Sequence, residues 1–115
     1  RALADLPRPF DVVTLGVGAD GHTASFFPHA ENLSAALAPD APAVVAVRAE
    51  RGGAAGDHPD RLTLALREIV TARLVILLAS GKAKRDVLDA AINGADHPVR
   101  HVLAARPDAW VCWHP

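Results

Sequence analysis

The feature that most constrains the fold is a short apolar run, residues 10–17, that leads directly into a turn with three glycines, Gly16-Val-Gly-Ala-Asp-Gly21. Its hydrophobicity is continuous rather than alternating, which is typical of a strand buried on both faces of a parallel sheet. A strand that ends in a glycine-rich turn is where α/β folds build active sites. The run therefore predicts a parallel strand with a candidate site at its carboxyl end.

Strand and helix patterns alternate along the rest of the chain, which predicts the α/β class. Apolar runs predict further strands over 43–47, 74–79 and 109–113. Helical periodicity predicts helices over 30–38, 62–71 and 82–92, and a shorter helix or turn over 98–103. Asn93-Gly94 is expected to end the third of these helices, and the glycine-rich residues 48–59 are expected to form an exposed loop.

Composition limits the kinds of protein that the chain can be. It has 115 residues, half of them hydrophobic, and a formal charge of −1, so we expect a packed domain with no basic surface for nucleic acid. The longest apolar run is far too short to span a membrane. A single cysteine, Cys112, excludes an internal disulfide and favours a reducing compartment such as the cytoplasm. Cys112 lies in an apolar strand pattern, where we expect a buried side chain.

The glycine-rich turn carries residue types suited to catalysis. Histidine is the side chain best suited to general-base work near neutral pH, and Asp20 stands two residues before His22, where its carboxylate could orient the ring. Amides around Gly18 and Gly21 could stabilise a developing oxyanion, and the hydroxyl of Thr23 could bind a sugar. A purely structural turn with a structural His–Asp pair fits the same pattern, so these residues alone predict a candidate site and no particular reaction.

Residues 16–28, Gly-Val-Gly-Ala-Asp-Gly-His-Thr-Ala-Ser-Phe-Phe-Pro, resemble the signature of the glucosamine-6-phosphate isomerase/6-phosphogluconolactonase family. The deaminases of this family share the first part but continue with Ile-Ala-Phe-Asn-Glu-Pro. This chain has Thr-Ala-Ser-Phe-Phe-Pro and lacks the acidic residue before the proline. It therefore resembles the lactonase branch, and residues 61–64 and 74–84 resemble later segments of the same branch.

The resemblance implies hydrolysis of 6-phosphogluconolactone to 6-phosphogluconate, a step of the pentose phosphate pathway, without a cofactor or a metal. It implies that His22 activates water and that Asp20 orients His22. It also implies that Gly18, Gly21 and Thr23 lie against the substrate. The five other histidines show no spacing typical of a metal site: His29, His58, His97, His101 and His114.

A phosphorylated substrate needs cationic partners. The resemblance makes Lys84 the first candidate, because it matches the family's phosphate-contacting lysine and would lie in the first turn of the helix over 82–92. Arg61 is the second candidate. Taken without the resemblance, a solvated helix face for Lys84 and a surface loop for Arg61 are the simpler interpretations.

The resemblance covers essentially all 115 residues but only the C-terminal part of a Rossmann-like parallel-sheet domain of the sugar-phosphate isomerase/lactonase type. The family's N-terminal half supplies a first strand and a Thr-Gly-Gly-Ser-type phosphate loop, which do not occur in this sequence. We therefore expect residues 1–115 to be a single partial domain, inactive or weakly active alone, that a missing half or a homo-oligomer completes. Two other functions stay open, a deaminase-like isomerase and a non-enzymatic sugar-phosphate-binding module.

Overall fold

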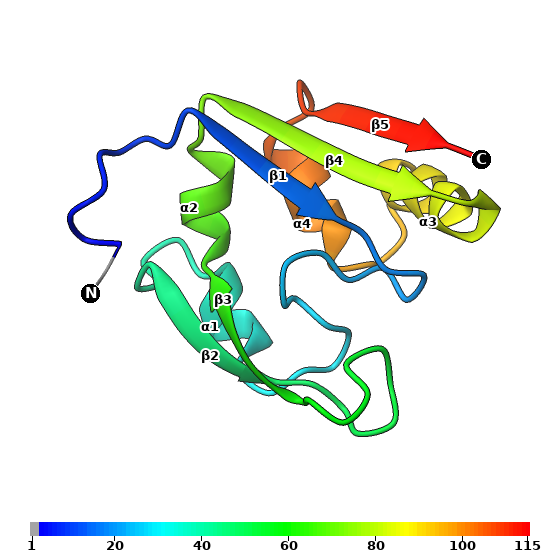
Figure 1. The fold of residues 1–115 in the computed structure, drawn as a ribbon, viewed down its shortest axis with the longest axis horizontal. Helices are drawn as coiled ribbons and strands as arrows, with labels where there is room; N and C mark the ends of the chain where they lie inside the picture. Colours follow the sequence, from blue (N-terminus) through cyan, green and yellow to red (C-terminus); the bar gives the residue numbers. More distant parts are fainter. Residues whose placement is uncertain (1–2) are drawn as a thin grey trace.

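The computed structural model describes residues 3–115 and has two sheets flanked by short helices (Figure 1). Strands β1, β4 and β5 form a parallel sheet in the order β1-β4-β5, and β2 and β3 form a separate antiparallel pair. The α/β class predicted from the sequence is confirmed. In chain order the elements are β1 Val12–Gly16, α1 Leu33–Leu37, β2 Val44–Arg48, β3 Asp60–Leu64, α2 Leu66–Val70, β4 Leu74–Ser80, α3 Lys82–Ile92, α4 Val99–Ala105 and β5 Trp110–His114.

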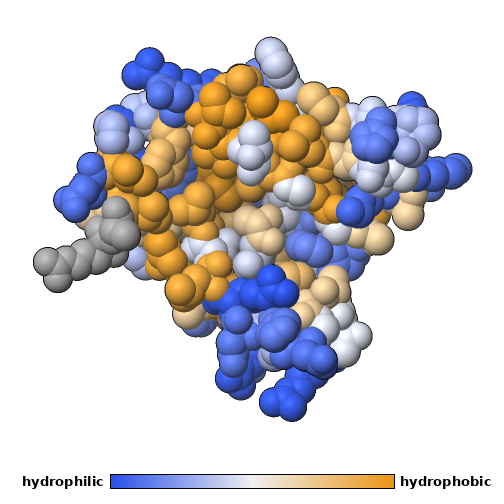
Figure 2. Space-filling model, in the orientation of Figure 1, coloured by the Kyte–Doolittle hydropathy of each residue, from blue (hydrophilic) through white to orange (hydrophobic). Residues whose placement is uncertain are grey.

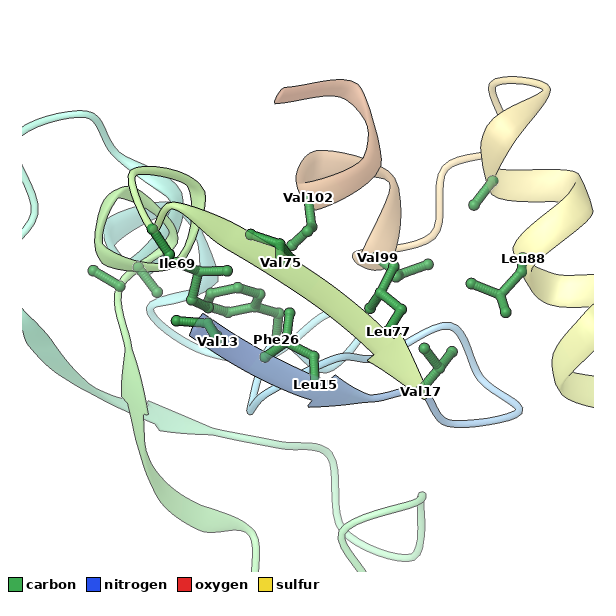
Figure 3. Packing of buried hydrophobic residues seen from close by; sticks show 14 of the residues in the cluster. Val13, Leu15, Val17, Phe26, Ile69, Val75, Leu77, Leu88, Val99 and Val102 are labelled. Carbon is green, nitrogen blue, oxygen red and sulfur yellow. The ribbon is translucent and has the colours of Figure 1, made fainter. Parts of the chain in front are cut away.

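The core lies on one face of the parallel sheet. Alternate residues of β1 and β4 point toward it, and their register places Val13 beside Val75 and Leu15 beside Leu77. Phe26, from the segment after β1, is fully buried in the same cluster, which Figure 3 shows packed between the strands and the helices. Because this aromatic ring anchors the segment after β1 in the core, the candidate site is fixed directly to the core.

The opposite face of the parallel sheet is not covered by any helix of residues 3–115. Val12 of β1 and Leu78 of β4 are each 50% exposed there, and Figure 2 shows apolar side chains gathered over β1 and β4. The prediction that the first strand is buried on both faces is therefore wrong for this chain. The same open face explains why Cys112 is exposed rather than buried as expected.

Residues 60–64 form a strand, so the helix predicted over 62–71 is wrong at its beginning. Leu62 is 74% exposed while Thr63 is buried, an alternation that belongs to a strand. β3 pairs with β2 in the register Val45↔Thr63, and only residues 66–70 are helical. The apolar period that suggested a longer helix was coincidental, because pairing with a distant strand decided the structure of residues 60–64.

The other predicted elements are confirmed, with ends that shift by a few residues. α3 ends at the expected place, because Gly94 adopts a positive φ of 100° and the amide of Ala95 donates to the carbonyl of Ala90. The helix predicted over 30–38 is shorter, Leu33–Leu37. Residues 49–59 form the expected loop between β2 and β3.

Arg106 joins the end of α2 to the start of β4. Its guanidinium donates hydrogen bonds to the carbonyls of Val70, Ala72 and Arg73. It also binds Asp108, and this hydrogen bond lowers the pKa of the Asp108 carboxyl. A single planar group thus satisfies three carbonyls from the turn between two core elements.

Replacing Arg106 by Met in the intact protein is expected to lower the free energy of unfolding by about 2–3 kcal/mol, because carbonyls in a part-buried turn lose their donors. Urea denaturation measures this as a lower midpoint with an unchanged slope. Arg100→Met, at an exposed position of α4, is the control, and its midpoint should stay at the wild-type value. Equal midpoints for Arg106→Met and the wild type would contradict the role given to Arg106.

Candidate functional site

A pocket of about 920 Å³ opens at the carboxyl ends of β1, β4 and β5. Ligand sites of parallel α/β sheets lie at this edge, where the loops after the strands meet. Of the residues predicted from the sequence, the pocket brings together His22, Lys84 and Gly18. The rest of its lining comes from the three strands and the turn after β1: Thr14, Leu15, Gly16, Val17, Ala24, Leu78, Ala79, Ser80, Cys112, Trp113 and His114.

His22 is held by Asp20 through two hydrogen bonds to the same carboxylate oxygen. Nδ1 of the imidazole lies 2.5 Å from Oδ1 of Asp20, and the backbone amide of His22 donates to that oxygen at 3.1 Å. Because an ionised carboxylate only accepts hydrogen bonds, Nδ1 carries the proton and Nε2 is left with a free lone pair. His22 lines the pocket, so this arrangement can take a proton from a group bound there.

Gly18 and Gly21 let the turn fold closely around His22. A side chain at Gly18 would collide with the His22 ring, and Gly21, at a φ of 88°, packs against His97. The amide of Gly18 donates to the carbonyl of His22 at 2.9 Å, and that of Gly21 donates to the carbonyl of Gly18 at 3.0 Å. In this conformation neither amide is free to hold an oxyanion, so the two glycines contribute space rather than hydrogen-bond donors.

Thr23 lies beneath the pocket rather than at its surface. Its side chain is 1% exposed, and its hydroxyl donates to the carbonyl of Gly16 at 2.7 Å. This bond ties the segment after His22 back to the end of β1. The structure therefore does not bring Thr23 to the pocket wall, where a substrate contact was predicted.

Lys84 lies in the first turn of α3, as predicted, and lines the same pocket as His22. Its neighbours on the helix are engaged elsewhere, since Lys82 binds Asp86 at 2.8 Å and Arg85 lies 3.9 Å from Asp89. Among the ion pairs of residues 3–115 there is none to Lys84. A lysine beside the amides of a helix N-terminus favours a bound anion.

Arg61 does not line the pocket but contacts the aromatic ring of Phe27, a residue that was not predicted from the sequence. The ring of Phe27 stacks on the His22 imidazole, with centroids 4.4 Å apart and planes at 30°. The guanidinium carbon of Arg61 lies over the same phenyl ring, 5.4 Å from its centroid. The Phe26-Phe27 pair was the available signal, since Phe26 is buried in the main core while Phe27 belongs to a second cluster and contacts His22.

The loop of residues 49–59 lies behind Phe27. Ala49 and Ala55 from this loop are buried against Phe27, which is itself only 4% exposed. The loop therefore contacts Phe27, which in turn contacts His22. The sequence could not indicate this position of the loop.

Within residues 3–115 no group of three or more His, Cys, Asp or Glu side chains is placed to hold a metal ion. None of the helices in this described part combines the length and the apolar character that a membrane span needs.

The sequence matches the family model described as glucosamine-6-phosphate isomerases/6-phosphogluconolactonase over residues 1–113. A 6-phosphogluconolactonase of Mesorhizobium japonicum is 43% identical over 117 residues, which are 99% of this chain and 47% of that protein. The structure of a 6-phosphogluconolactonase from Shewanella baltica is similar with a TM-score of 0.77 and 36% identity, over 97% of this chain and 46% of that one. The chain thus spans about half the length of the curated relatives it matches.

A second similar structure is the 6-phosphogluconolactonase from Thermotoga maritima, with a TM-score of 0.73 and 28% identity. The match covers 96% of this chain and 45% of that one. Both structural matches thus extend over nearly the whole of this chain.

Proposed function

Because the chain belongs to the glucosamine-6-phosphate isomerase/6-phosphogluconolactonase family, we propose that it carries the catalytic part of an enzyme that hydrolyses 6-phosphogluconolactone to 6-phosphogluconate. The observation that supports this most directly is the hydrogen bond of Asp20 to His22, because His22 lines the pocket that Lys84 also lines. A base and a cation in one pocket suit an ester with a phosphate at its other end.

His22 acts as the general base. Nε2 takes a proton from water while the water oxygen adds to the lactone carbonyl carbon, which gives a tetrahedral intermediate and an imidazolium. The intermediate collapses as the bond to the ring oxygen breaks, and the imidazolium returns its proton to that oxygen. The product is the open-chain acid, and His22 is again neutral. Asp20 keeps Nδ1 protonated throughout and stabilises the imidazolium that forms between the two steps.

Lys84 binds the phosphate of the substrate in the pocket that His22 also lines. In the intact protein, Lys84→Ala is expected to raise KM for 6-phosphogluconolactone by about 10–100-fold, the loss of one charge-assisted contact, and to change kcat by less than about threefold. Steady-state kinetics checks this. Lys82→Ala is the matched control, because Lys82 is paired with Asp86 and does not line the pocket. An unchanged KM for Lys84→Ala would show that the phosphate binds elsewhere.

Polypeptide outside residues 1–115 supplies the rest of the substrate site. The pocket opens onto the uncovered face of the parallel sheet, and β1 forms one edge of the sheet as residues 3–115 build it. Exposed edges and apolar faces of this kind are normally paired or covered. We propose that residues 1–115 are part of one domain, completed either by the other half of the protein or by a second copy, and that the isolated part has little activity. A cytoplasmic location fits the lone cysteine.

The alternatives predict different products. A deaminase would release ammonia from glucosamine 6-phosphate, and a binding module would turn over neither compound. The intact protein should hydrolyse the lactone and leave the amino sugar unchanged, which parallel assays of acid and ammonia release measure. The uncatalysed hydrolysis of the lactone has to be subtracted. Ammonia release without lactone hydrolysis would establish the deaminase instead.

A further inference from the structure

We propose that Phe27 and Arg61 are positioning residues that hold the His22 ring in its working orientation, an inference that rests on His22 being the general base. The hydrogen bond to Asp20 fixes the position of Nδ1 but leaves the ring plane free to rock about that contact. The stack of Phe27 on the imidazole fixes the plane. Together they fix both the position and the plane of a ring that lines the pocket.

The phenyl ring also suits the charge that His22 acquires. When Nε2 takes a proton the imidazole becomes a cation against an aromatic face, which is a favourable arrangement. The stack therefore serves both the neutral ring, by orienting it, and the charged ring, through its contact with the aromatic face.

Phe27 is held in turn by Arg61 and by the loop behind it. The Arg61 guanidinium lies over the phenyl ring, while its Nε donates to the carbonyl of His58 at 2.7 Å and its Nη2 to that of Ala55 at 3.4 Å. Ala55 also packs against Phe27. Arg61 thus joins the loop to the Phe27 ring. Its Nε and Nη2 groups donate to loop carbonyls and are therefore engaged away from the pocket.

β3 supports the same segment at a second point. Thr63, two residues after Arg61 and on the same side of the strand, accepts a hydrogen bond from the amide of Ser25 at 3.2 Å. β3 therefore contacts the segment after His22 at both Ser25 and Phe27. Arg61 does not line the pocket of His22 and Lys84, so the structure favours support of the catalytic segment over phosphate binding.

Phe27→Leu and Phe27→Tyr test the stack in the intact protein. Leu keeps an apolar side chain but no ring, so kcat for 6-phosphogluconolactone should fall about tenfold with KM within about twofold of the wild type, as for a misplaced catalytic group. Tyr keeps the ring and should restore kcat to within about threefold. An unchanged kcat in Phe27→Leu, or no rescue by Tyr in a folded protein, would overturn the proposal.

Arg61→Met separates positioning from phosphate binding, with Lys84→Ala as its counterpart. Arg61→Met should lower kcat by about fivefold and leave the Kd for 6-phosphogluconate, measured by calorimetry, within about twofold. Lys84→Ala should do the opposite and raise that Kd by about tenfold or more. If Arg61→Met weakened binding of 6-phosphogluconate as Lys84→Ala does, with kcat unchanged, Arg61 would be a phosphate ligand and the proposal would be wrong.

A measurement that needs no turnover keeps this inference separate from the proposed function. The NMR signals of the His22 ring, assigned by their loss in His22→Asn, should move in Arg61→Met although Arg61 does not touch His22. They should not move in Arg67→Met, an arginine of α2 outside the stack. Signals that stay fixed in Arg61→Met would overturn the role of Arg61, whereas absent lactone hydrolysis by the wild type would overturn the proposed function alone.

Discussion

His22→Asn in the intact protein should lower kcat for 6-phosphogluconolactone by about two to four orders of magnitude, the usual contribution of a general base. Asn can keep a hydrogen bond to Asp20 through its side-chain amide, so the turn should stay folded. It has no lone pair on nitrogen able to take a proton from water, so the chemical step loses its base. KM should change by less than about threefold, since Lys84 and the pocket remain.

The control for this substitution is His29→Asn. His29 has a φ of 60°, a conformation that Asn adopts readily, and it does not line the pocket. Its kcat should equal that of the wild type, and thermal unfolding of both variants should show that they are folded. A full kcat in a folded His22→Asn would remove His22 from the mechanism.

Gly18→Ala should be nearly as damaging although it removes no functional group. A methyl at this position would overlap the His22 ring and crowd the Asp20 carboxylate, so the ring has to leave its hydrogen bond. A displacement of about 1 Å in a catalytic group costs about 100-fold in rate. The expected result is therefore a kcat about 100-fold below the wild type, with a circular dichroism spectrum that is unchanged.

Two comparisons show whether Gly18→Ala acts through His22. Gly53→Ala, in the loop away from the pocket, adds a methyl with ordinary contacts and should leave kcat unchanged. Gly18→Ala placed in the His22→Asn background should lower kcat little further, because both changes remove the same function. Fully additive losses would indicate that Gly18 serves the reaction in some other way.

Local signals account for the parts of the fold that could be predicted. The continuous apolar runs of β1 and β4 and the Asn93-Gly94 end of α3 are decided by neighbouring residues, and the structure confirms them. β3 could not be predicted in the same way, because its pairing with β2 joins residues that an 11-residue loop of mixed composition separates. The prediction that β1 is buried on both faces was wrong for a related reason, since no helix of residues 3–115 covers the second face of the sheet.

The features of the candidate site likewise fall into those that local sequence predicts and those that depend on tertiary contacts. The His22–Asp20 pair and the place of Lys84 in the first turn of α3 follow from spacing, and the structure brings His22 and Lys84 to one pocket. The conformation of the turn decides which acceptors the Gly18 and Gly21 amides bind and where the Thr23 hydroxyl points. Spacing along the sequence does not indicate that conformation. The contact of Phe27 with both His22 and Arg61 requires β3 to meet the segment of residues 22–27, which no local pattern indicates.

The most direct test of the central claim is the rate of acid release from freshly prepared 6-phosphogluconolactone, followed at constant pH with the intact protein and with buffer alone. Hydrolysis of each lactone frees one carboxylic acid proton, so titrant consumption reports the reaction itself. The account predicts a rate above that of buffer that rises in proportion to protein concentration and that His22→Asn lowers by about two to four orders of magnitude. A wild-type rate equal to the buffer rate at every protein concentration would contradict it.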